Sequence, residues 1–596
     1  MYPDTLLFQV SKPARYTGGE WQAVRRDWDA SALRFALGYP DLYEIGMSNL
    51  AIQILYELLN RRGDILCERF FMPWIDMLSA LRQASQPLRS LENGRPLSDF
   101  DVLGFSIGYE LTFTNILAIL DLAGLPVWAR MRTDDHPLVI AGGSAVFNPE
   151  PMADFIDLFV IGEAETVLPR LVDLIKEHKV GGRLAKGELL RAAAGMPGVY
   201  VPALYETTET GTLLPLDDAP GTIKRQIVSP LPPAPVRPIV PFIETVHDRA
   251  AVEVSRGCTR GCRFCSAGII YRPVRERPPA ETLTAVDEIL QNTGYDEVSL
   301  VSLSSGDYSR IGELLAGIAR CHGSDVAVSL PSLRLDESSV CLVDALPGRR
   351  KSGLTFAPEA ASPRLQRVIN KHIPEDELLQ AAGLAFERGW SGLKLYFMLG
   401  LPTETDDDAS YIVELARKVL AAGKDAPGRM PQLRLSLATF VPKPHTPFQW
   451  VAQAPEETLR TRHEIIKKGL GKRAKLSYTD TQVSLLEAVM SRGDRRLGKV
   501  IHRAWQAGAV FDGWSECFDW ERWQQAFEAE GIDPDFYARR ARALDEPLPW
   551  GHIDVGVSAE FLSTEYRRAL AAELTPYCRV SKCNSCGLES WGAGCP

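Results

Sequence analysis

Three cysteines that stand close together, Cys258, Cys262 and Cys265, form a CxxxCxxC spacing with no fourth cysteine nearby. A structural zinc site takes four protein ligands, so three thiolates from one loop do not complete one. Three thiolates can instead hold a [4Fe–4S] cluster by three of its irons and leave the fourth iron open to an exchangeable ligand. The spacing therefore predicts an iron–sulfur cluster with one open position.

Four more cysteines gather in the last 19 residues in a Cx4CxxCx8C spacing. They are Cys578, Cys583, Cys586 and Cys595. Four thiols around a CxxC core predict either zinc or a second iron–sulfur cluster, and spacing does not separate the two. The alternative is a reduced, mobile tail without metal. Seven of the eleven cysteines thus fall in two tight groups, which is typical of ligands in a reducing compartment.

The overall composition is that of a soluble globular protein, with 45% hydrophobic and 24% charged residues. The net charge of −10 excludes a chain whose whole surface binds polyanions. No segment approaches the ~20 apolar residues that span a bilayer, and the N-terminal stretch does not resemble a signal peptide, so we expect a cytoplasmic protein with no membrane partner. A local basic stretch at 460–503 is either a solvated helix face or a surface where an RNA backbone docks.

The N-terminal part of the chain alternates short apolar strands with helical patterns. The strands are expected at 33–38, 101–107, 138–141 and 158–161. Such alternation predicts an α/β domain over residues 1–206, with a parallel, doubly wound, Rossmann-like sheet.

Neither the helical nor the strand periodicity continues through the proline-rich segment at 207–245, which indicates a stiff, extended linker. The alternation then restarts over 246–456. Six strands are expected at 252–254, 298–303, 326–330, 354–356, 393–397 and 433–439. Six βα repeats predict a partial (β/α)6 TIM-like barrel, with functional residues at the C-terminal ends of its strands. Residues 457–577 have a helical pattern, and the cysteine-rich tail occupies 578–596.

The segment CTRGCRFC, placed directly after a strand at the start of a βα barrel, resembles the motif of the radical SAM family, which has an aromatic residue where Phe264 stands. The resemblance implies that S-adenosylmethionine (SAM) binds the open iron of the [4Fe–4S] cluster, and that an electron from the cluster cleaves it to a 5′-deoxyadenosyl radical. It also implies an oxygen-sensitive enzyme that takes electrons from a reductant such as flavodoxin or ferredoxin.

Three other barrel segments resemble the same family. SLSSGDYS suggests Gly306 and Asp307 as contacts of the SAM amino group, although an ordinary turn with Asp near a helix N-cap explains it equally well. Glu359 stands where the family has a polar residue facing SAM on the fourth strand. KLYFMLGLPTETDDD is similar to the family's fifth-strand GxP segment, and its acidic end is expected to begin a helix.

The first domain resembles cobalamin-binding domains fused to radical SAM barrels. Asp41, Tyr43 and Gly46 give DxYxxG where methionine synthase-type domains carry DxHxxG, so the histidine that binds cobalt is absent. The resemblance implies further cobalamin contacts at Ser106, Gly142, Gly143 and Glu163. Small residues at the edge of a parallel sheet leave a crevice for a flat macrocycle. The alternative is a degenerate flavodoxin-like domain that binds no cobalamin.

Two histidines in proline- and glycine-rich segments are candidates for proton transfer if they face the mouth of the barrel. They are His445 in PKPHTPF and His552 in PWGHIDVG. The other interpretation is that both are hydrogen-bonded loop histidines.

We therefore predict a radical SAM enzyme that carries out cobalamin-dependent methylation of an unactivated carbon on an unknown substrate. The alternatives are radical SAM chemistry without methylation, such as sulfur insertion, rearrangement or redox chemistry, or an RNA- or ribosome-associated iron–sulfur factor.

Overall fold

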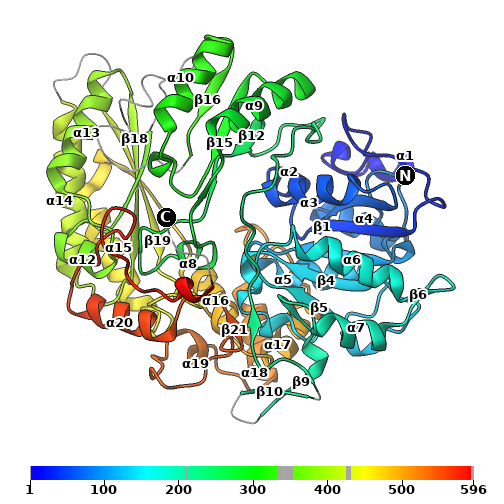
Figure 1. Cartoon of the computed structure of the whole chain (residues 1–596). Helices are drawn as coiled ribbons and strands as arrows, with labels where there is room; N and C mark the ends of the chain where they lie inside the picture. The colour runs from blue at the N-terminus through cyan, green and yellow to red at the C-terminus, as the bar shows by residue number, and fades with distance from the viewer. Residues whose placement is uncertain are drawn as a thin grey trace.

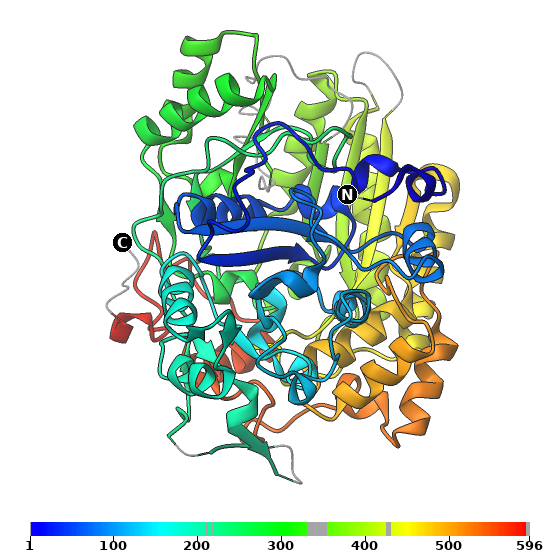
Figure 2. The same ribbon diagram turned by 90° about the vertical axis from the view of Figure 1, so that its right-hand side faces the viewer.

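The computed structural model describes residues 2–208, 212–216, 218–331, 340, 354–424 and 431–591. The first domain, blue to cyan in Figure 1, lies beside the barrel, which is green to yellow. The orange helices of the C-terminal region lie at the bottom of Figure 1, and the red end of the chain rises from them to the middle of the view. Figure 2 likewise shows the orange helices low in the molecule and the red segment on the opposite side. No helix among the described residues is long and apolar enough to cross a membrane.

The first domain contains a six-stranded sheet in the order β2-β1-β3-β4-β5-β8. Its strands are β1 (Leu33–Tyr39), β2 (Ile65–Phe71), β3 (Val102–Ser106), β4 (Leu138–Gly142), β5 (Leu158–Val160) and β8 (Val199–Tyr200). All neighbours are parallel except β8, which is antiparallel to β5. The predicted doubly wound sheet is confirmed. Strand β2 was missed because Glu68 and Arg69 interrupt its apolar run, although both are buried.

Helix α3 (Leu50–Asn60) covers one face of this sheet, and α5 (Phe113–Leu122) covers the other. Nine of the ten residues of α5 are buried, because α17 (Leu497–Gln506) from the C-terminal region packs against it. A helix that is apolar all round is stable only when it is covered on every side. The first domain and the C-terminal helices consequently share one hydrophobic core.

The barrel contains the six predicted strands in two parallel sections. They are β12 (Ala250–Glu253), β15 (Glu297–Val301) and β16 (Ala327–Ser329), followed by β17 (Leu354–Glu359), β18 (Gly392–Leu399) and β19 (Gln432–Thr439). Helices α9 (Pro279–Thr293), α10 (Ile311–His322), α13 (Glu375–Glu387) and α14 (Asp406–Ala422) lie between them. A seventh strand, β20 (Lys475–Tyr478), pairs with β19 where we expected helix. Its sequence is too polar to carry a strand signal.

The segment expected to be an irregular linker contains short strands. β9 (Tyr205–Thr207) and β10 (Leu213–Pro215) form a hairpin, and β11 (Ile223–Lys224) pairs with β21 (Ile553–Asp554) near the end of the chain. Arg225 follows β11 and donates to the carbonyl of Val555 at 2.6 Å. The connector is therefore fastened to the C-terminal region, a long-range pairing that proline content does not reveal.

The C-terminal region is helical, as predicted. Its main helices are α15 (Glu456–Leu470), α16 (Thr481–Arg492), α17, α18 (Trp520–Ala529) and α20 (Ala559–Leu570). Helix α20 returns to the barrel and contacts α12 (Pro363–Val368). The tail after it therefore starts next to the barrel.

His445 connects the barrel to the first domain. It lies in the loop after β19, and its Nε2 donates to the carbonyl of Phe147 at 2.9 Å. Burial lowers its pKa from 6.5 to about 4, so the ring is neutral in the folded protein. His552 is also buried, beside Tyr200, and burial lowers its pKa to about 3. Both are buried histidines at domain contacts.

Acidification should destabilise the fold through His445. Above pH 6.5 the imidazole is neutral in both the folded and the unfolded chain. Below pH 6.5 the unfolded chain binds the proton first, so the free energy of unfolding falls as the pH drops from 6.5 toward 4. The loss from His445 should reach roughly 3 kcal/mol. Thermal unfolding midpoints measured from pH 7.5 to 4.5 should fall less steeply for His445→Gln than for the wild type. Parallel curves would contradict this assignment, and His552, which is present in both proteins, cancels in the comparison.

Candidate functional site

The three-cysteine loop leaves the first barrel strand through β13 (Ser255–Arg256). Gly257 opens it at φ +91°, and a Cβ there would lie 2.3 Å from the carbonyl oxygen of Pro273. Only glycine fits this turn. The loop thus begins at the carboxyl end of a barrel strand, where the fold places functional residues.

The three thiols of this loop, Cys258, Cys262 and Cys265, form no disulfide and are partly buried. Burial raises the pKa of the Cys258 and Cys265 thiols, a direction that a bound metal reverses by stabilising the thiolate. No three His, Cys, Asp or Glu side chains in the described part of the chain are arranged to hold a metal ion. In an iron–sulfur cube each thiolate bonds a different iron, so its thiols need not converge on one point. Three thiols on one loop, none of them in a disulfide, fit this donor set.

The loop after the second barrel strand is tied to the cysteine loop. Asp307, in the short 3-10 helix η8 (Ser305–Asp307) with Gly306, accepts from Arg260 Nε at 2.7 Å and forms a second contact with the same guanidinium. Ser304 donates to Asp307 at 2.7 Å. Arg260 lies between Cys258 and Cys262, so Asp307 holds the loop itself.

The other two residues predicted to approach SAM are Phe264, on the cysteine loop, and Glu359, at the end of β17. Phe264 is partly buried and packs against a hydrophobic cluster that includes Val368, Ile369 and Leu401. Glu359 ends β17 with φ +66°, a strained conformation for a non-glycine residue, and pairs with Lys371 at 3.0 Å.

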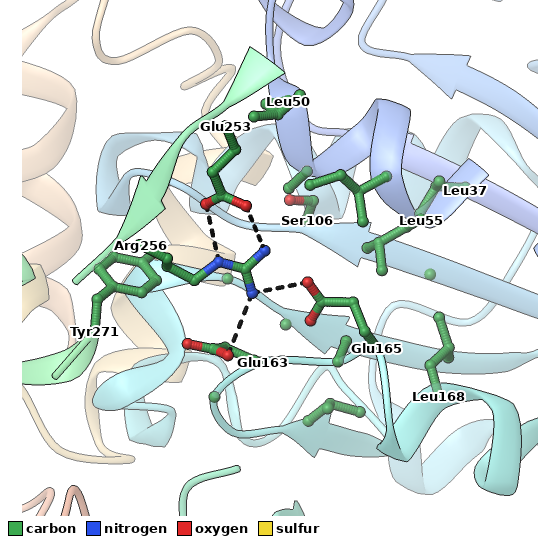
Figure 3. A pocket seen from close by; sticks show the side chains of 18 of the residues that line it. Leu37, Leu50, Leu55, Ser106, Glu163, Glu165, Leu168, Glu253, Arg256 and Tyr271 are labelled. Carbon is green, nitrogen blue, oxygen red and sulfur yellow. Dashed lines mark hydrogen bonds and ion pairs between the residues drawn. The ribbon is translucent and has the colours of Figure 1, made fainter. Parts of the chain in front are cut away.

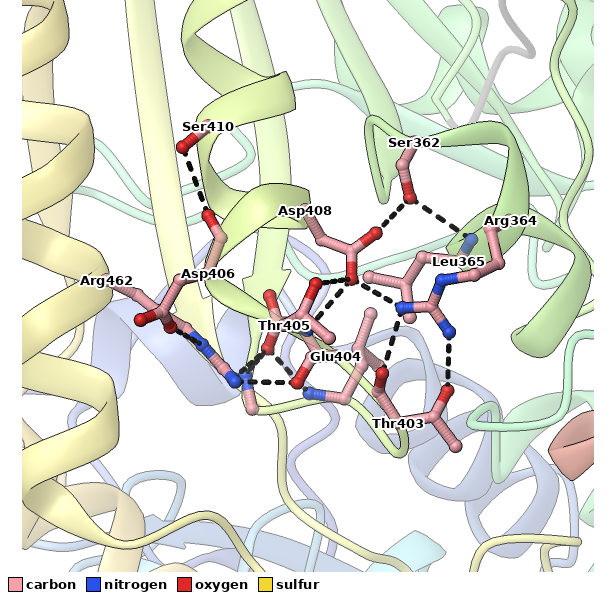
Figure 4. Close-up of polar contacts among 12 residues, drawn as sticks. Ser362, Arg364, Leu365, Thr403, Glu404, Thr405, Asp406, Asp408, Ser410 and Arg462 are labelled. Carbon is pink, nitrogen blue, oxygen red and sulfur yellow. Dashed lines mark hydrogen bonds and ion pairs between the residues drawn. The ribbon is translucent and has the colours of Figure 1, made fainter.

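The predicted fifth-strand segment forms a closed polar network (Figure 4). Glu404 accepts from the backbone N–H of Leu401 at 3.1 Å and pairs with Arg462 of α15 at 2.5 Å. Burial raises its pKa to about 7, against the opposing effect of Arg462. Thr405 and Asp408 form a capping box at the start of α14, which confirms that the acidic stretch begins a helix.

A cavity of about 350 Å³ lies between the first domain and the barrel. The carboxyl ends of β1, β3, β4 and β5 form one wall, with apolar side chains from α3, and the segments 253–256 and 301–303 form the other. Ser106, Gly142, Gly143 and Glu163 all line it. Four residues predicted from two segments of the sequence thus meet at one cavity.

Gly143 shapes the floor of this cavity. It has φ +111°, and an added Cβ would lie 2.4 Å from the carbonyl oxygen of Ile107. The strands therefore approach more closely here than any side chain permits. The absent side chains of Gly142 and Gly143 leave the edge of the sheet open.

Arg256 stands on the barrel side of the cavity among three carboxylates (Figure 3). It pairs with Glu165 at 2.7 Å, Glu253 at 2.8 Å and Glu163 at 3.2 Å, and its side chain is 10% exposed. Burial alone lowers the pKa of the Arg256 guanidinium, but the three carboxylates raise it by more. The net shift of the pKa is upward, so the guanidinium remains charged. Arg256 directly precedes Gly257 and Cys258, so this network connects the first domain to the cysteine loop.

Glu163 is the most constrained of the three carboxylates. Its Oε2 accepts from Arg275 and from the backbone of Val228, both at 2.7 Å. Its Oε1 is buried and has no hydrogen-bond partner among the described residues. A buried acceptor without a donor costs free energy unless a ligand supplies the donor.

The DxYxxG residues do not line the cavity. The Asp41 carboxylate accepts from Trp514 Nε1 at 3.1 Å, and the Tyr43 hydroxyl donates to Glu20 at 3.0 Å. A Cβ on Gly46 would lie 2.2 Å from the Phe71 ring. Contacts with the C-terminal region and with the domain core thus account for Asp, Tyr and Gly at these three positions.

The tail cysteines lie in different surroundings. The Cys578 thiol is 3.9 Å from the carbonyl oxygen of Thr259 in the cysteine loop. Cys583 is exposed and contacts Glu589 at 2.7 Å, whereas Cys586 is buried. Cys595 lies outside the described residues.

Half of the twelve lysines and arginines in 460–503 form ion pairs with acidic residues. The pairs are Arg460 with Glu456, Arg462 with Glu404, Lys467 with Glu464, Arg495 with Glu150, Arg496 with Asp494, and Arg503 with Glu530. Arg492 is buried and donates to backbone carbonyls. The stretch offers much less unpaired positive charge than its sequence indicates.

Sequence reasoning missed Arg256, Glu253 and Tyr271, which line the cavity on the barrel side. A signal was present for the first two, because an acid and a base three residues apart directly precede the cysteine motif. Their partners on the first domain come from about 90 residues away in the chain, and no local pattern pairs them.

Comparison with known families decides the class of protein. Residues 252–416 match the family described as "Radical SAM superfamily", and residues 51–202 match "Radical SAM proteins, N-terminal". Together the two matches cover more than half of the chain. The chain is a radical SAM protein. The match in the barrel includes the three-cysteine loop, and the predicted enzyme class is confirmed.

Several relatives of this radical SAM protein are known. A protein of Methanocaldococcus jannaschii described as uncharacterized is 29% identical over 78% of this chain and 90% of its own length. The ribosomal protein uS12 methylthiotransferase RimO of Acidothermus cellulolyticus is 24% identical over 45% of this chain, which spans 64% of that relative. Among solved structures, the radical SAM methyltransferase TsrM of Kitasatospora setae, with cobalamin and a [4Fe–4S] cluster bound, gives a TM-score of 0.48 at 15% identity over 84% of this chain and 99% of its own.

A methyl group added at Gly143 should test the close approach at the cavity floor. Gly143→Ala should destabilise the protein by about 1–3 kcal/mol more than Gly124→Ala, because Gly124 has a similarly positive φ of +71° but open space around it. Thermal and urea unfolding of both variants measure the difference. Equal losses would mean that backbone strain alone, without the contact to Ile107, fixes glycine at this position.

Proposed function

We propose that this radical SAM enzyme binds cobalamin in the cavity between its two α/β domains and methylates an unactivated carbon of a substrate still to be identified. The observation that carries the proposal is the position of the cavity. One wall holds four of the seven predicted cobalamin contacts, Ser106, Gly142, Gly143 and Glu163, and the other is the strand end that leads directly into the three-cysteine loop.

The residues proposed to hold the iron–sulfur cluster are Cys258, Cys262 and Cys265. A [4Fe–4S] cluster at this loop supplies, when bound, the electron that cleaves SAM to a carbon radical. The segment 304–307 follows β15 and Glu359 ends β17, and both are proposed to position SAM beside the loop. A reductant such as flavodoxin or ferredoxin is proposed to deliver the electron.

The chain itself prepares the cavity for a large, mostly apolar ligand with polar amide edges. Leu37, Leu50 and Leu168 supply apolar wall, and Ser106 offers a hydroxyl. The unpartnered Oε1 of Glu163 is an acceptor suited to an amide N–H donor of the macrocycle. No histidine is among the described residues that line the cavity, so the proposed cobalamin receives no imidazole from this wall.

The Arg256 network has a positioning role in this proposal. Its guanidinium crosses from the barrel to Glu163 and Glu165 of the first domain and keeps the two walls at a fixed separation. Breaking one partner of a buried ion pair costs more than the pair itself contributes, so the network resists movement of either wall. The groups bound at the two walls would therefore keep the same distance and orientation during the reaction.

Two variants should separate the two proposed cofactors. Ser106→Phe fills the cavity with an aromatic ring and should abolish cobalamin binding while iron content stays at the wild-type level. Cys258→Ser should do the reverse. Anaerobic reconstitution followed by corrinoid absorption spectra and iron analysis measures both.

The wild-type protein should also release 5′-deoxyadenosine from SAM when a reductant is added. Absence of that product would overturn the radical mechanism. Full cobalamin binding by Ser106→Phe would instead place the corrinoid elsewhere.

A further inference from the structure

The cysteine loop is enclosed by residues from the far end of the chain. Helix α20 and the segment after it, from Glu565 to Arg579, contact the loop from Thr259 to Arg263 and the neighbouring Asp307. We call residues 565–579 the C-terminal clamp. None of its contacts belongs to the interdomain cavity described above.

The innermost contact is a buried ion pair at Arg263, which stands between Cys262 and Phe264. Its side chain is 0% exposed, and Nε donates to Glu565 at 3.0 Å. Its Nη2 donates to the Thr575 hydroxyl at 3.1 Å, and Nη1 donates to the carbonyl of Arg367 at 2.9 Å. Thr575 in turn donates to Glu565 at 2.7 Å. A buried guanidinium with every donor face satisfied fixes the backbone that carries it.

A second contact fixes the loop at Gly261. Asn370 donates through Nδ2 to the Gly261 carbonyl at 3.1 Å and accepts through Oδ1 from the Thr575 backbone N–H at 2.9 Å. Asn370 itself has φ +53° and is buried. One amide side chain thus links the clamp to the residue directly before Cys262.

The outer contacts close the loop on the solvent side. Arg579 donates to the carbonyl of Asp307 at 2.8 Å and to the Glu276 carboxylate at 2.6 Å. The Tyr577 ring lies 4.1 Å from the Arg260 guanidinium, which is the partner of Asp307. Tyr577 and Arg579 therefore line, with Cys258 and Asp307, the small space at the start of the cysteine loop.

We propose that the C-terminal clamp positions the cysteine loop for cluster binding, with Glu565, Thr575 and Arg579 as positioning residues that act through Arg263, Gly261 and Asp307. The proposal rests on the proposed cluster at Cys258, Cys262 and Cys265. Cys262 stands directly between two clamped residues, Gly261 and Arg263, so a loosened clamp lets its sulfur move relative to those of Cys258 and Cys265. Residues that orient metal ligands from outside typically change metal affinity by about 10- to 100-fold when they are removed.

The test compares iron release from variants of the full chain reconstituted under anaerobic conditions. Glu565→Gln and Arg579→Gln should lose iron to a soluble chelator about 10- to 100-fold faster than the wild type. They should also broaden the electron paramagnetic resonance signal of the reduced cluster. Glu560→Gln, an exposed carboxylate on the same helix, should release iron at the wild-type rate.

Arg579→Gln keeps the test decisive if Glu565→Gln does not fold, because Arg579 is only partly buried. Arg579→Lys should recover part of the retention, since it keeps the charge but not the two-pronged geometry. Wild-type release rates and spectra in folded Arg579→Gln and Glu565→Gln would overturn the clamp alone. A wild-type protein that takes up no cluster would overturn the proposed function as well.

Discussion

The buried charge network around Arg256 is the constraint on which the arrangement of the site depends. One guanidinium, two residues before Cys258, is held by Glu253 at the end of β12 and by Glu163 and Glu165 of the first domain. Three buried carboxylates repel one another unless a cation stays among them, so the Arg256 guanidinium must remain in place. The edge of the sheet and the cysteine loop consequently cannot separate without exposing unpaired charge.

The remainder of the fold supports this contact from two directions. The C-terminal helices share a core with the first domain, and the same region pairs with the connector through β11 and β21. Helix α20 and the tail then return to the barrel and hold the cysteine loop from its other side. The C-terminal region is therefore the element that joins the two walls of the cavity.

The sequence was sufficient for the elements whose signal is local. Thiol spacing and apolar periodicity are each visible within a few residues of sequence. The three-cysteine loop, the parallel sheet and the six barrel strands could therefore be recognised. Ser106, Gly142, Gly143 and Glu163 were found through family resemblance, and the structure brings them together at one cavity.

The rest depends on partners that are distant in the chain. Asp41, Tyr43 and Gly46 fit a binding motif in sequence, yet Trp514, Glu20 and Phe71 account for them by packing. The basic stretch at 460–503 has some of its acidic partners, such as Glu150 and Glu404, far away in sequence, so its net charge could not be judged locally. Similarly, nothing local in Glu565 or Arg579 indicates the cysteine loop some 300 residues earlier.

Cobalamin and the iron–sulfur cluster are proposed to occupy neighbouring sites on the two walls of one junction. Pulsed electron paramagnetic resonance can measure their separation in the wild-type protein, loaded anaerobically with Co(II) cobalamin and with its cluster reduced. We expect a magnetic dipolar interaction between cobalt and cluster that disappears in Ser106→Phe. Two independent signals with no interaction in the fully loaded wild type would show that the two cofactors are not neighbours.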